Sequence, residues 1–217
     1  LVSYGLVERV QLHENLEITA HRAGAMLAPE NTVAAIRKAI EARADWAEID
    51  VQRTADGAVA ALHDSDLMRV AGERRRVSES TLAEIKAIDV GSHFSAEFKG
   101  ERVPTLDEAL AAAGDRIRFN IELKPGSAAD VEPLVRAVLN STDRAGITGR
   151  CRLCSQSYES LQLARRLKPG LQVGFIAGAR LGDLSKLDVA FLMVSQRLAT
   201  RTLVDSGRAR GVDVHAW

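Results

Sequence analysis

The chain has 217 residues, of which 46% are hydrophobic and 27% are charged, and its 29 basic residues balance 29 acidic ones. This length suffices for one domain with a substantial core, while charge neutrality argues against a nucleic-acid-binding protein, which usually carries a basic excess. No apolar run approaches the roughly 18 residues of a membrane span, no secretory signal core is present, and two cysteines cannot form a disulfide framework. The composition therefore predicts a soluble globular domain.

The two ends of the chain are unusual. Residue 1 is Leu rather than Met, and the chain stops at Trp217 within an alternating pattern that includes Val212 and Val214. We therefore expect the sequence to be a piece of a longer polypeptide. Within it, residues 1–15 are expected to be a lead-in segment to a single domain over residues 1–217.

Short apolar strands alternate with amphipathic helices along the chain. The first half predicts strand 16–20, a helix capped by Asn31, strand 46–51, a turn at Asp56-Gly57, strand 59–62, and helices opened by capping boxes at Thr81–Glu84 and Thr105–Glu108. The second half predicts strands 117–123, 151–155, 171–176, 190–194 and 212–216, separated by helices 130–139, 158–167, 181–185 and 199–209. Such alternation predicts parallel strands joined by right-handed crossovers.

Eight strand candidates favour an α/β fold of the (β/α)8 TIM-barrel type over an open sheet. Such barrels typically have about 250 residues, so we expect this chain to lack the last helix. The Asp56-Gly57 turn takes the place of the helix that would otherwise separate strands 2 and 3.

Two predicted strands carry acidic residues on a face that a barrel normally fills with branched apolar side chains. Glu48 and Asp50 share one face of the second strand, and Glu122 lies on the polar face of the fourth. Buried carboxylates are costly unless they are paired or bind a cation. Oxygen ligands alone indicate a hard cation such as Ca²⁺ or Mg²⁺ rather than zinc. The alternative, two solvated edge strands, conflicts with a closed barrel.

Two histidines stand at the ends of predicted strands. His21 closes the first strand and is followed by Arg22, and His63 closes the third and is followed by Asp64. A single histidine at such a position is more often structural than catalytic. Barrel enzymes, however, place their chemistry at the C-terminal ends of the strands, and a pair of imidazoles beside a cation site indicates acid–base catalysis.

Several short motifs follow one another in a fixed order. They are His21-Arg22-Ala23-Gly24, Pro29-Glu30-Asn31-Thr32, Glu48-Ile49-Asp50-Val51, Thr54-Ala55-Asp56-Gly57, His63-Asp64, Gly91-Ser92, Pro104-Thr105-Leu106, Ile121-Glu122-Leu123-Lys124 and His215-Ala216-Trp217. Their order and spacing resemble those of the glycerophosphodiester phosphodiesterases, from about Ile18 onward. Two features depart from the family pattern. His-Arg-Ala-Gly stands where His-Arg-Gly is common, and the chain stops where the family continues through a Thr-Val-Asn-like segment and a closing helix.

The resemblance implies a TIM-barrel enzyme that hydrolyses glycerophosphodiesters to an alcohol and sn-glycerol 3-phosphate with a divalent metal ion, Ca²⁺ or Mg²⁺. It implies a metal site formed by Glu48, Asp50 and Glu122, and a general acid and base formed by His21 and His63. It also implies that the substrate-binding residues are Arg22, Glu30, Lys124 and Trp217. Among these, Arg22 and Lys124 bind the phosphate, Glu30 orients Arg22, and Trp217 packs against the glycerol.

Several alternatives stay open. The nucleophile is either water or the glycerol 2-hydroxyl, and either histidine can be the acid. A related barrel phosphodiesterase that acts on lysophospholipids, of the lysophospholipase D or phospholipase C type, would share the metal site. A catalytically silent binding domain would have lost site groups that are present here.

The expected partner is a small-molecule glycerophosphodiester and not a nucleic acid. Membrane association is expected only through segments outside this chain. Two locations are compatible with the sequence: the chain is either a cytoplasmic protein or an extracytoplasmic domain of a membrane-anchored protein.

Overall fold

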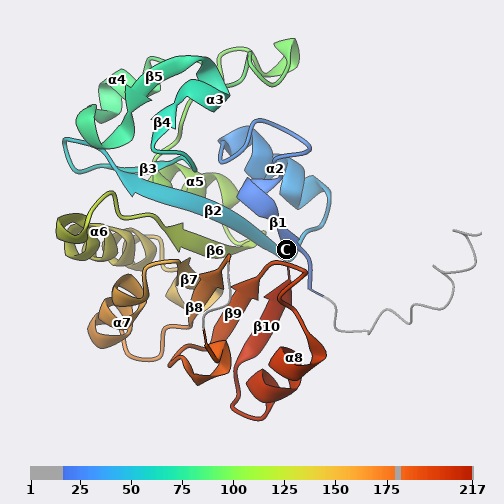
Figure 1. Ribbon diagram of the computed structural model, residues 1–217. Helices are drawn as coiled ribbons and strands as arrows, with labels where there is room; N and C mark the ends of the chain where they lie inside the picture. The colour runs from blue at the N-terminus through green and yellow to red at the C-terminus, as the bar shows by residue number, and fades with distance from the viewer. Residues whose placement is uncertain (1–16, 179–181, 217) are drawn as a thin grey trace, which may run out of the picture.

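The computed structural model describes residues 17–178 and 182–216 (Figure 1). Its strands are β1 (Thr19–Ala20), β2 (Trp46–Arg53), β3 (Val59–Ala61), β4 (Asp66–Leu67), β5 (Glu73–Arg76), β6 (Arg118–Leu123), β7 (Cys151–Ser155), β8 (Val173–Ala177), β9 (Phe191–Val194) and β10 (Asp213–Ala216). Its α-helices are α2 (Val33–Glu41), α3 (Met68–Ala71), α4 (Leu82–Lys86), α5 (Leu106–Ala113), α6 (Val131–Arg144), α7 (Tyr158–Leu167) and α8 (Arg201–Arg208). Short 3₁₀ turns are η1 (His21–Ala23), η2 (Val77–Glu79), η3 (Ala96–Phe98), η4 (Ala128–Asp130), η5 (Thr148–Arg150) and η6 (Leu184–Lys186). The predicted lead-in segment and Trp217 lie outside the described residues.

Within the described residues, seven strands run parallel in one curved sheet, in the order β1-β2-β6-β7-β8-β9-β10. The helices α6, α7 and α8 follow their strands and lie on the outer side of this sheet (Figure 1). A second small sheet consists of β4 and β5. Parallel strands that alternate with outer helices confirm the predicted (β/α)8-barrel class.

The third predicted strand has a different direction from the one that a regular barrel requires. β3 pairs with the C-terminal half of β2 in antiparallel orientation, with Val51 opposite Ala61 and Arg53 opposite Val59. Only residues 54–58 connect the two strands, and such a short link cannot carry a parallel crossover. The predicted turn in place of a helix is thus confirmed, and β3 is an addition to the parallel strands rather than one of them.

Helix starts follow most of the capping signals in the sequence. The Thr81 and Thr105 hydroxyls each accept a backbone hydrogen bond from the glutamate three residues later, and both predicted capping boxes are confirmed. The predicted short helix at 181–185 falls partly outside the described residues, and its described part overlaps the 3₁₀ turn η6. Within the described part of the chain, no helix combines the length and the apolar character needed to cross a membrane.

The prediction that Asn31 caps α2 is wrong. The Thr32 hydroxyl accepts a hydrogen bond from the backbone N–H of Ala35 at 3.2 Å, so Thr32 is the N-cap. Both residue types are good caps, and the sequence alone did not distinguish them. The Asn31 side chain is left for another contact, which it makes with Asp50 on β2.

The hydrophobic core lies between the sheet and its outer helices. Alternate residues of β2, β6 and β7, among them Ile49, Ile121 and Leu153, are fully buried against residues of α2, α5, α6 and α7. The intervening residues of the same strands point to the barrel interior, because successive side chains alternate between the two faces. That interior is polar, with Glu48 and Arg152 as two of its buried residues.

Arg152 on β7 is a second buried charged residue of the barrel interior. Its guanidinium carbon lies 3.9 Å from the centroid of the Trp46 ring and 4.8 Å from that of Phe191. Its Nε donates a hydrogen bond to Asn120 Oδ1. The buried charge is therefore held by ring faces and one amide.

Gly174 on β8 gives a test of this packing. A Cβ at this position would lie 2.0 Å from Cε2 of Phe191, so we expect Gly174→Ala to destabilise the protein by about 1–3 kcal/mol. Gly178→Ala is a matched control, since a Cβ there meets nothing within 4 Å. Urea unfolding measures both. Equal stability of the two variants would contradict the placement of the Phe191 ring.

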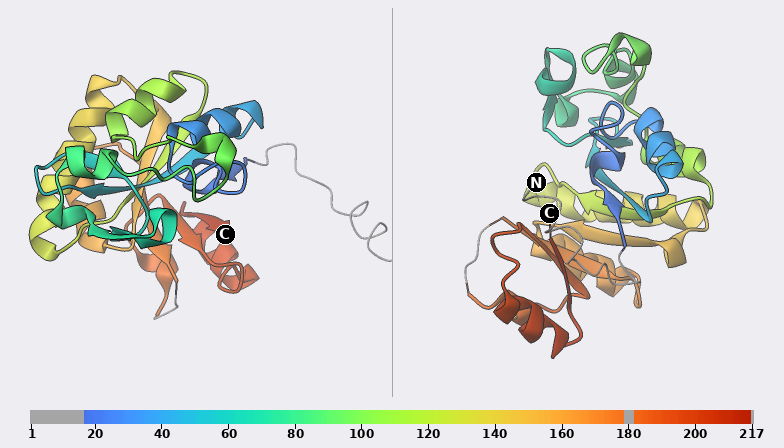
Figure 2. Two further views of the ribbon diagram at one scale, coloured as in Figure 1. Left: turned by 90° about the horizontal axis from the view of Figure 1, so that it is seen from above. Right: turned by 90° about the vertical axis from the view of Figure 1, so that its right-hand side faces the viewer.

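Residues 62–104 form an insertion between β3 and α5. It contains β4, α3, β5 and α4 and has a small core of its own, formed by Leu62, Leu67, Val77, Ile85, Val90 and Val103 together with Ala60. It stands on the β2–β3 side of the molecule, away from β9 and β10 (Figures 1 and 2). This insertion supplies three side chains to the site described next, namely His63, Asp64 and Arg69.

Candidate active site

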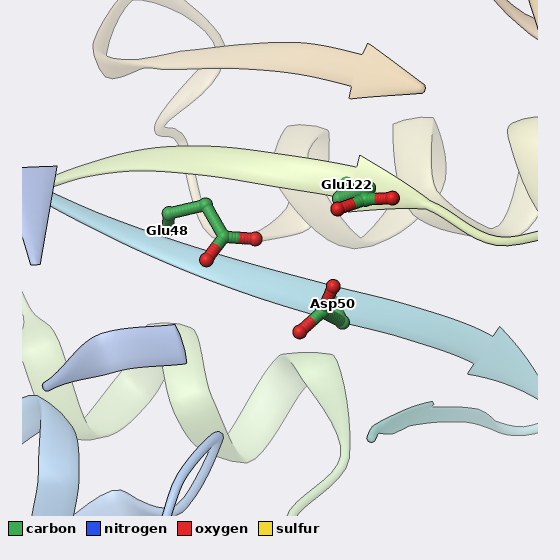
Figure 3. A group of neighbouring side chains, drawn as sticks. All are labelled: Glu48, Asp50 and Glu122. Atoms are coloured by element: carbon green, nitrogen blue, oxygen red, sulfur yellow. The ribbon is translucent and has the colours of Figure 1, made fainter. Parts of the chain in front are cut away.

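Three carboxylates from two neighbouring strands meet in the barrel interior. Asp50 on β2 lies opposite Glu122 on β6, and Glu48 lies one inward position earlier on β2. Figure 3 shows the three side chains gathered over these two strands. Each offers an oxygen within 4.8 Å of the others, and their exposed fractions are only 3%, 1% and 9% for Glu48, Asp50 and Glu122. The predicted cluster is therefore assembled by the strand register.

Few positive groups compensate this negative charge. Lys124 Nζ lies 2.7 Å from Glu122 Oε1 and 3.2 Å from Asp50 Oδ1. Asn31 Nδ2 donates to Asp50 Oδ2 at 2.8 Å, and the Asn31 Oδ1 accepts from the Asp50 N–H at 3.1 Å. Among the described residues, the buried Glu48 Oε1 has no hydrogen-bond donor. Three carboxylates thus face one ammonium group.

This surplus of negative charge changes the ionisation of the carboxyls. Burial raises the pKa of Glu48 well above its ordinary value, and the neighbouring Asp50 adds to the effect. Burial likewise raises the pKa of Glu122 to about 7, with Lys124 opposing the shift and Asp50 reinforcing it. Burial opposes the charge of Lys124, but Asp50 and Glu122 outweigh it and raise the pKa of this ammonium. A cation bound among the carboxylates would relieve their repulsion.

His21 lies in a tight turn directly after β1. The turn holds Arg22 at φ 48° and Ala23 at φ 60°, left-handed conformations that favour glycine. The Arg22 N–H donates to Glu48 Oε2 at 2.6 Å and so ties the turn to the carboxylate cluster. Desolvation lowers the pKa of His21, and the positive charge of Arg22 adds to this shift, while the charge of Asp50 opposes it.

His63 is oriented by the residue that follows it. Its Nδ1 lies 2.6 Å from Asp64 Oδ1. Burial opposes the ionisation of Asp64, but hydrogen bonds from Arg69 and His63 outweigh it and lower the Asp64 pKa. Because an ionised carboxylate only accepts hydrogen bonds, Nδ1 carries the proton of this contact. Within residues 17–178 and 182–216, Nε2 has no hydrogen-bond partner.

Arg22, which the sequence predicts to bind phosphate, pairs with Glu30 in the structure. Arg22 Nη1 lies 3.1 Å from both oxygens of Glu30. The Arg22 Nε is buried and has no acceptor among the described residues, so the guanidinium keeps a donor for a further ligand. Glu30 itself is held by a second arginine, Arg69.

These contacts join the predicted site residues other than His21 and Trp217, directly or through Asp64 and Arg69. His21 lies next to Arg22 in the turn after β1. Sequence reasoning missed three residues that support these site residues, namely Asn31, Asp64 and Arg69. Asp64 carried a local signal, since it directly follows a strand-end histidine. Asn31 and Arg69 did not, because their carboxylate partners Asp50 and Glu30 are 19 and 39 residues away in the sequence.

Known proteins share both the sequence pattern and the fold. Residues 21–217 match the glycerophosphoryl diester phosphodiesterase family. A glycerophosphodiester phosphodiesterase of Caldanaerobacter subterraneus is 36% identical over 165 residues, which cover 73% of this chain and 65% of that protein. One of Arabidopsis thaliana is 33% identical over 217 residues, covering 95% of this chain and 65% of its own length. The chain thus spans less than two thirds of the length of these relatives.

Solved structures extend the similarity to three dimensions. A phosphodiesterase of Oleispira antarctica, solved in complex with the product sn-glycerol-3-phosphate, is 29% identical and matches with a TM-score of 0.86. The match covers 93% of this chain and 84% of that chain.

Proposed function

The chain belongs to the glycerophosphoryl diester phosphodiesterase family, and from this premise we propose that it hydrolyses glycerophosphodiesters to an alcohol and sn-glycerol 3-phosphate. One observation carries the proposal. Arg22 and Lys124 contact a buried cluster of three carboxylates at one end of the barrel, and His21 and His63 lie just after β1 and β3. This combination supplies proton transfer and anion binding in one place. All these groups come from the single domain that we propose for residues 1–217.

The carboxylate cluster is proposed to hold a divalent cation. The buried Glu48 Oε1 lacks a donor among the described residues, and one ammonium faces three carboxylates. A ligand set of carboxylate oxygens favours Ca²⁺ or Mg²⁺ over zinc. When bound, such a cation polarises a phosphoryl oxygen as a Lewis acid.

The side chains around the cluster have separate proposed tasks. A phosphodiester carries one negative charge, and Arg22 and Lys124 bind its free oxygens and stabilise the charge that grows on them in the transition state. Glu30 holds the Arg22 guanidinium in place through contacts of 3.1 Å. One histidine removes a proton from the nucleophile, and the other donates a proton to the leaving alcohol.

Asp64 gives His63 a defined place in this scheme. The 2.6 Å contact with Nδ1 fixes the ring and directs Nε2 away from Asp64. The carboxylate also stabilises the imidazolium that forms when the ring takes up a proton. His21 is instead placed by the strained turn that follows β1.

A second candidate function is cleavage of a lysophospholipid by the same site. A cavity of about 290 Å³ adjoins the Glu30–Arg69 pair. Its lining is mostly apolar and includes Leu62, Val70, Val90, Phe94 and Val103. An apolar chain on the substrate would fit such a lining better than a small polar alcohol would.

A substrate panel separates the two candidates. Glycerophosphocholine, glycerophosphoethanolamine and lysophosphatidylcholine are each incubated with the protein and Ca²⁺ or Mg²⁺, and the products are identified by ³¹P NMR. We expect glycerol 3-phosphate from the two small diesters. Faster cleavage of lysophosphatidylcholine would favour the second candidate, and no cleavage of any of the three would contradict the proposed enzyme activity.

The raised carboxyl pKa values predict a pH-dependent stability of the metal-free protein. The Glu122 pKa is about 7 in the folded state against an ordinary 4.5, so between these values the folded state binds more protons than the unfolded state. The free energy of unfolding therefore falls as the pH rises through this window. The contribution of Glu122 is on the order of 1–3 kcal/mol.

The measurement is urea unfolding in EDTA at pH 5.5, 6.5 and 7.5, compared between the wild type and Glu122→Gln. The comparison is needed because the pKa values of His21 and His215 are lowered by burial, which gives the opposite slope in the same range. We expect the advantage of the wild type over the variant to shrink as the pH rises. A constant difference would contradict the shifted ionisation of Glu122.

A further inference from the structure

Arg69 on α3 binds two carboxylates of the site at once. Its Nε donates to Asp64 Oδ2 at 2.7 Å. Its Nη1 and Nη2 donate to the two oxygens of Glu30, each at 2.7 Å. All three nitrogens of the guanidinium are therefore engaged by two acidic side chains that come from different loops.

Each of these carboxylates has a second partner within the proposed machinery. Glu30 contacts Arg22, with both oxygens 3.1 Å from Nη1. Asp64 contacts His63 at Nδ1, 2.6 Å away. Arg69 is thus the central member of a continuous chain of charged hydrogen bonds from Arg22 to His63.

We infer that Arg69 is a positioning residue, which holds the Arg22 guanidinium and the His63 imidazole in a fixed relation through Glu30 and Asp64. The inference rests on the proposed function of Arg22 and His63. Arg69 itself does not have to touch the substrate.

The geometry of the guanidinium explains why arginine suits this position. Its planar fork presents donors in fixed directions and engages Glu30 with two parallel hydrogen bonds while Nε reaches Asp64. A lysine has one ammonium on a flexible chain and cannot reproduce this arrangement. The contact distances of 2.7 Å to Glu30 are also shorter than those of Arg22 to the same carboxylate. Glu30 is therefore held mainly from the Arg69 side.

Without Arg69 both carboxylates lose a charged partner at 2.7 Å. Burial opposes the ionisation of Glu30, and hydrogen bonds from Arg69 together with the charge of Arg22 outweigh it and lower the Glu30 pKa. Glu30 would then keep only the longer contacts to Arg22, and Asp64 would keep only His63. The Asp64 carboxylate could rotate, and the His63 ring would no longer be restricted to one tautomer and one orientation.

A merely structural role is the competing explanation. Arg69 lies in the insertion, in the same lobe as β4 and β5 (Figure 1), and its pair with Glu30 also connects this lobe to the loop before α2. A structural role predicts lower stability of an Arg69 variant with an unchanged His63 ring in the molecules that stay folded.

The test uses Arg69→Gln and Arg69→Lys in the full chain, with Arg75→Gln as the control. Arg75 belongs to the same insertion and pairs with the exposed Glu84 at 3.2 Å, outside the chain of contacts described above. The first readout is the ¹⁵N NMR signal of the His63 ring, which reports which nitrogen carries the proton. The second is kcat and KM for glycerophosphocholine.

We expect a single Nδ1–H tautomer of His63 in the wild type and in Arg75→Gln, and a mixture of tautomers in both Arg69 variants. We also expect kcat/KM to fall about 10²-fold in Arg69→Gln, with little recovery in Arg69→Lys and no loss in Arg75→Gln. If Arg69→Gln does not fold, Arg69→Lys, which keeps the charge, gives the same comparison.

A wild-type His63 signal in folded Arg69 variants would overturn the inference, whether or not their stability is reduced. An altered His63 signal combined with unchanged kcat/KM would overturn it as well. If the wild type cleaves no glycerophosphodiester at all, the proposed function fails, and the NMR comparison still decides whether Arg69 fixes the His63 ring.

Discussion

Replacing either His21 or His63 with alanine is expected to lower kcat for glycerophosphodiesters by about 10²–10⁴-fold, the usual contribution of a general acid or base. His63 is held by Asp64 at 2.6 Å, and His21 lies in the turn that Arg22 ties to Glu48. Neither imidazole belongs to the cluster of three carboxylates. Metal affinity should therefore stay within a few-fold of the wild type in both variants.

Activity is measured as glycerol 3-phosphate release, and metal affinity as titration of the EDTA-treated protein by calorimetry. His93→Ala is the control, because His93 is an exposed histidine that lines the cavity beside Glu30 and lies outside the network of His21 and His63. Near-normal turnover in both His21→Ala and His63→Ala would refute the assignment of the two histidines as acid and base.

Glu122→Gln is expected to weaken metal binding and activity together, each by at least about tenfold. Glu122 supplies one of the three carboxylates, and an amide has about the same shape without the charge. The change also removes the negative charge that Lys124 contacts at 2.7 Å, so Lys124 would shift its pairing toward Asp50. Both effects leave fewer anionic oxygens for a hard cation.

Calorimetric titration with Ca²⁺ and Mg²⁺ gives the affinity, and kinetics at several metal concentrations give the activity. Glu132→Gln on α6 is the matched control, since Glu132 is exposed and pairs with Arg136 four residues later. Loss of activity in Glu122→Gln at full metal occupancy would assign Glu122 another role.

The strand faces were the most predictable part of the site. Side chains alternate along a strand, so Glu48 and Asp50 had to share a face, and that face had to be the inner one because Ile49 and Val51 are apolar. The sequence left the register between β2 and β6 undetermined. The structure pairs Asp50 with Glu122 directly, which turns two acidic strands into one cluster.

The antiparallel direction of β3 could have been predicted from the length of its connection to β2. The prediction of eight parallel strands did not take this length into account. The five residues 54–58 between β2 and β3 form a turn at Asp56-Gly57. A connection of this length joins antiparallel strands, since a parallel crossover needs a dozen residues or more. The hydrophobic pattern of residues 59–62 alone fits either direction.

The supporting shell of the site was the least predictable part. Arg69 reads as one basic residue in a polar segment, and only the folded insertion brings it to Glu30 and Asp64. Asn31 was predicted to cap α2 because asparagine is a good N-cap residue, but its neighbour Thr32 has the same tendency. Such contacts depend on where whole segments dock, and local sequence patterns do not contain that information. Trp217, which was predicted to pack against the glycerol, lies outside the described residues.

Glycerol 3-phosphate release from glycerophosphocholine after EDTA treatment, followed by addition of Ca²⁺, Mg²⁺ or Mn²⁺, tests the central claim most directly. Among the described residues, Lys124 pairs with Asp50 and Glu122 of the buried cluster, and the Glu48 Oε1 has no donor. We therefore expect no release in EDTA and recovery with at least one of the three ions. Undiminished release in EDTA, with the metal content of the protein verified as zero, would contradict a metal-dependent phosphodiesterase built on these carboxylates.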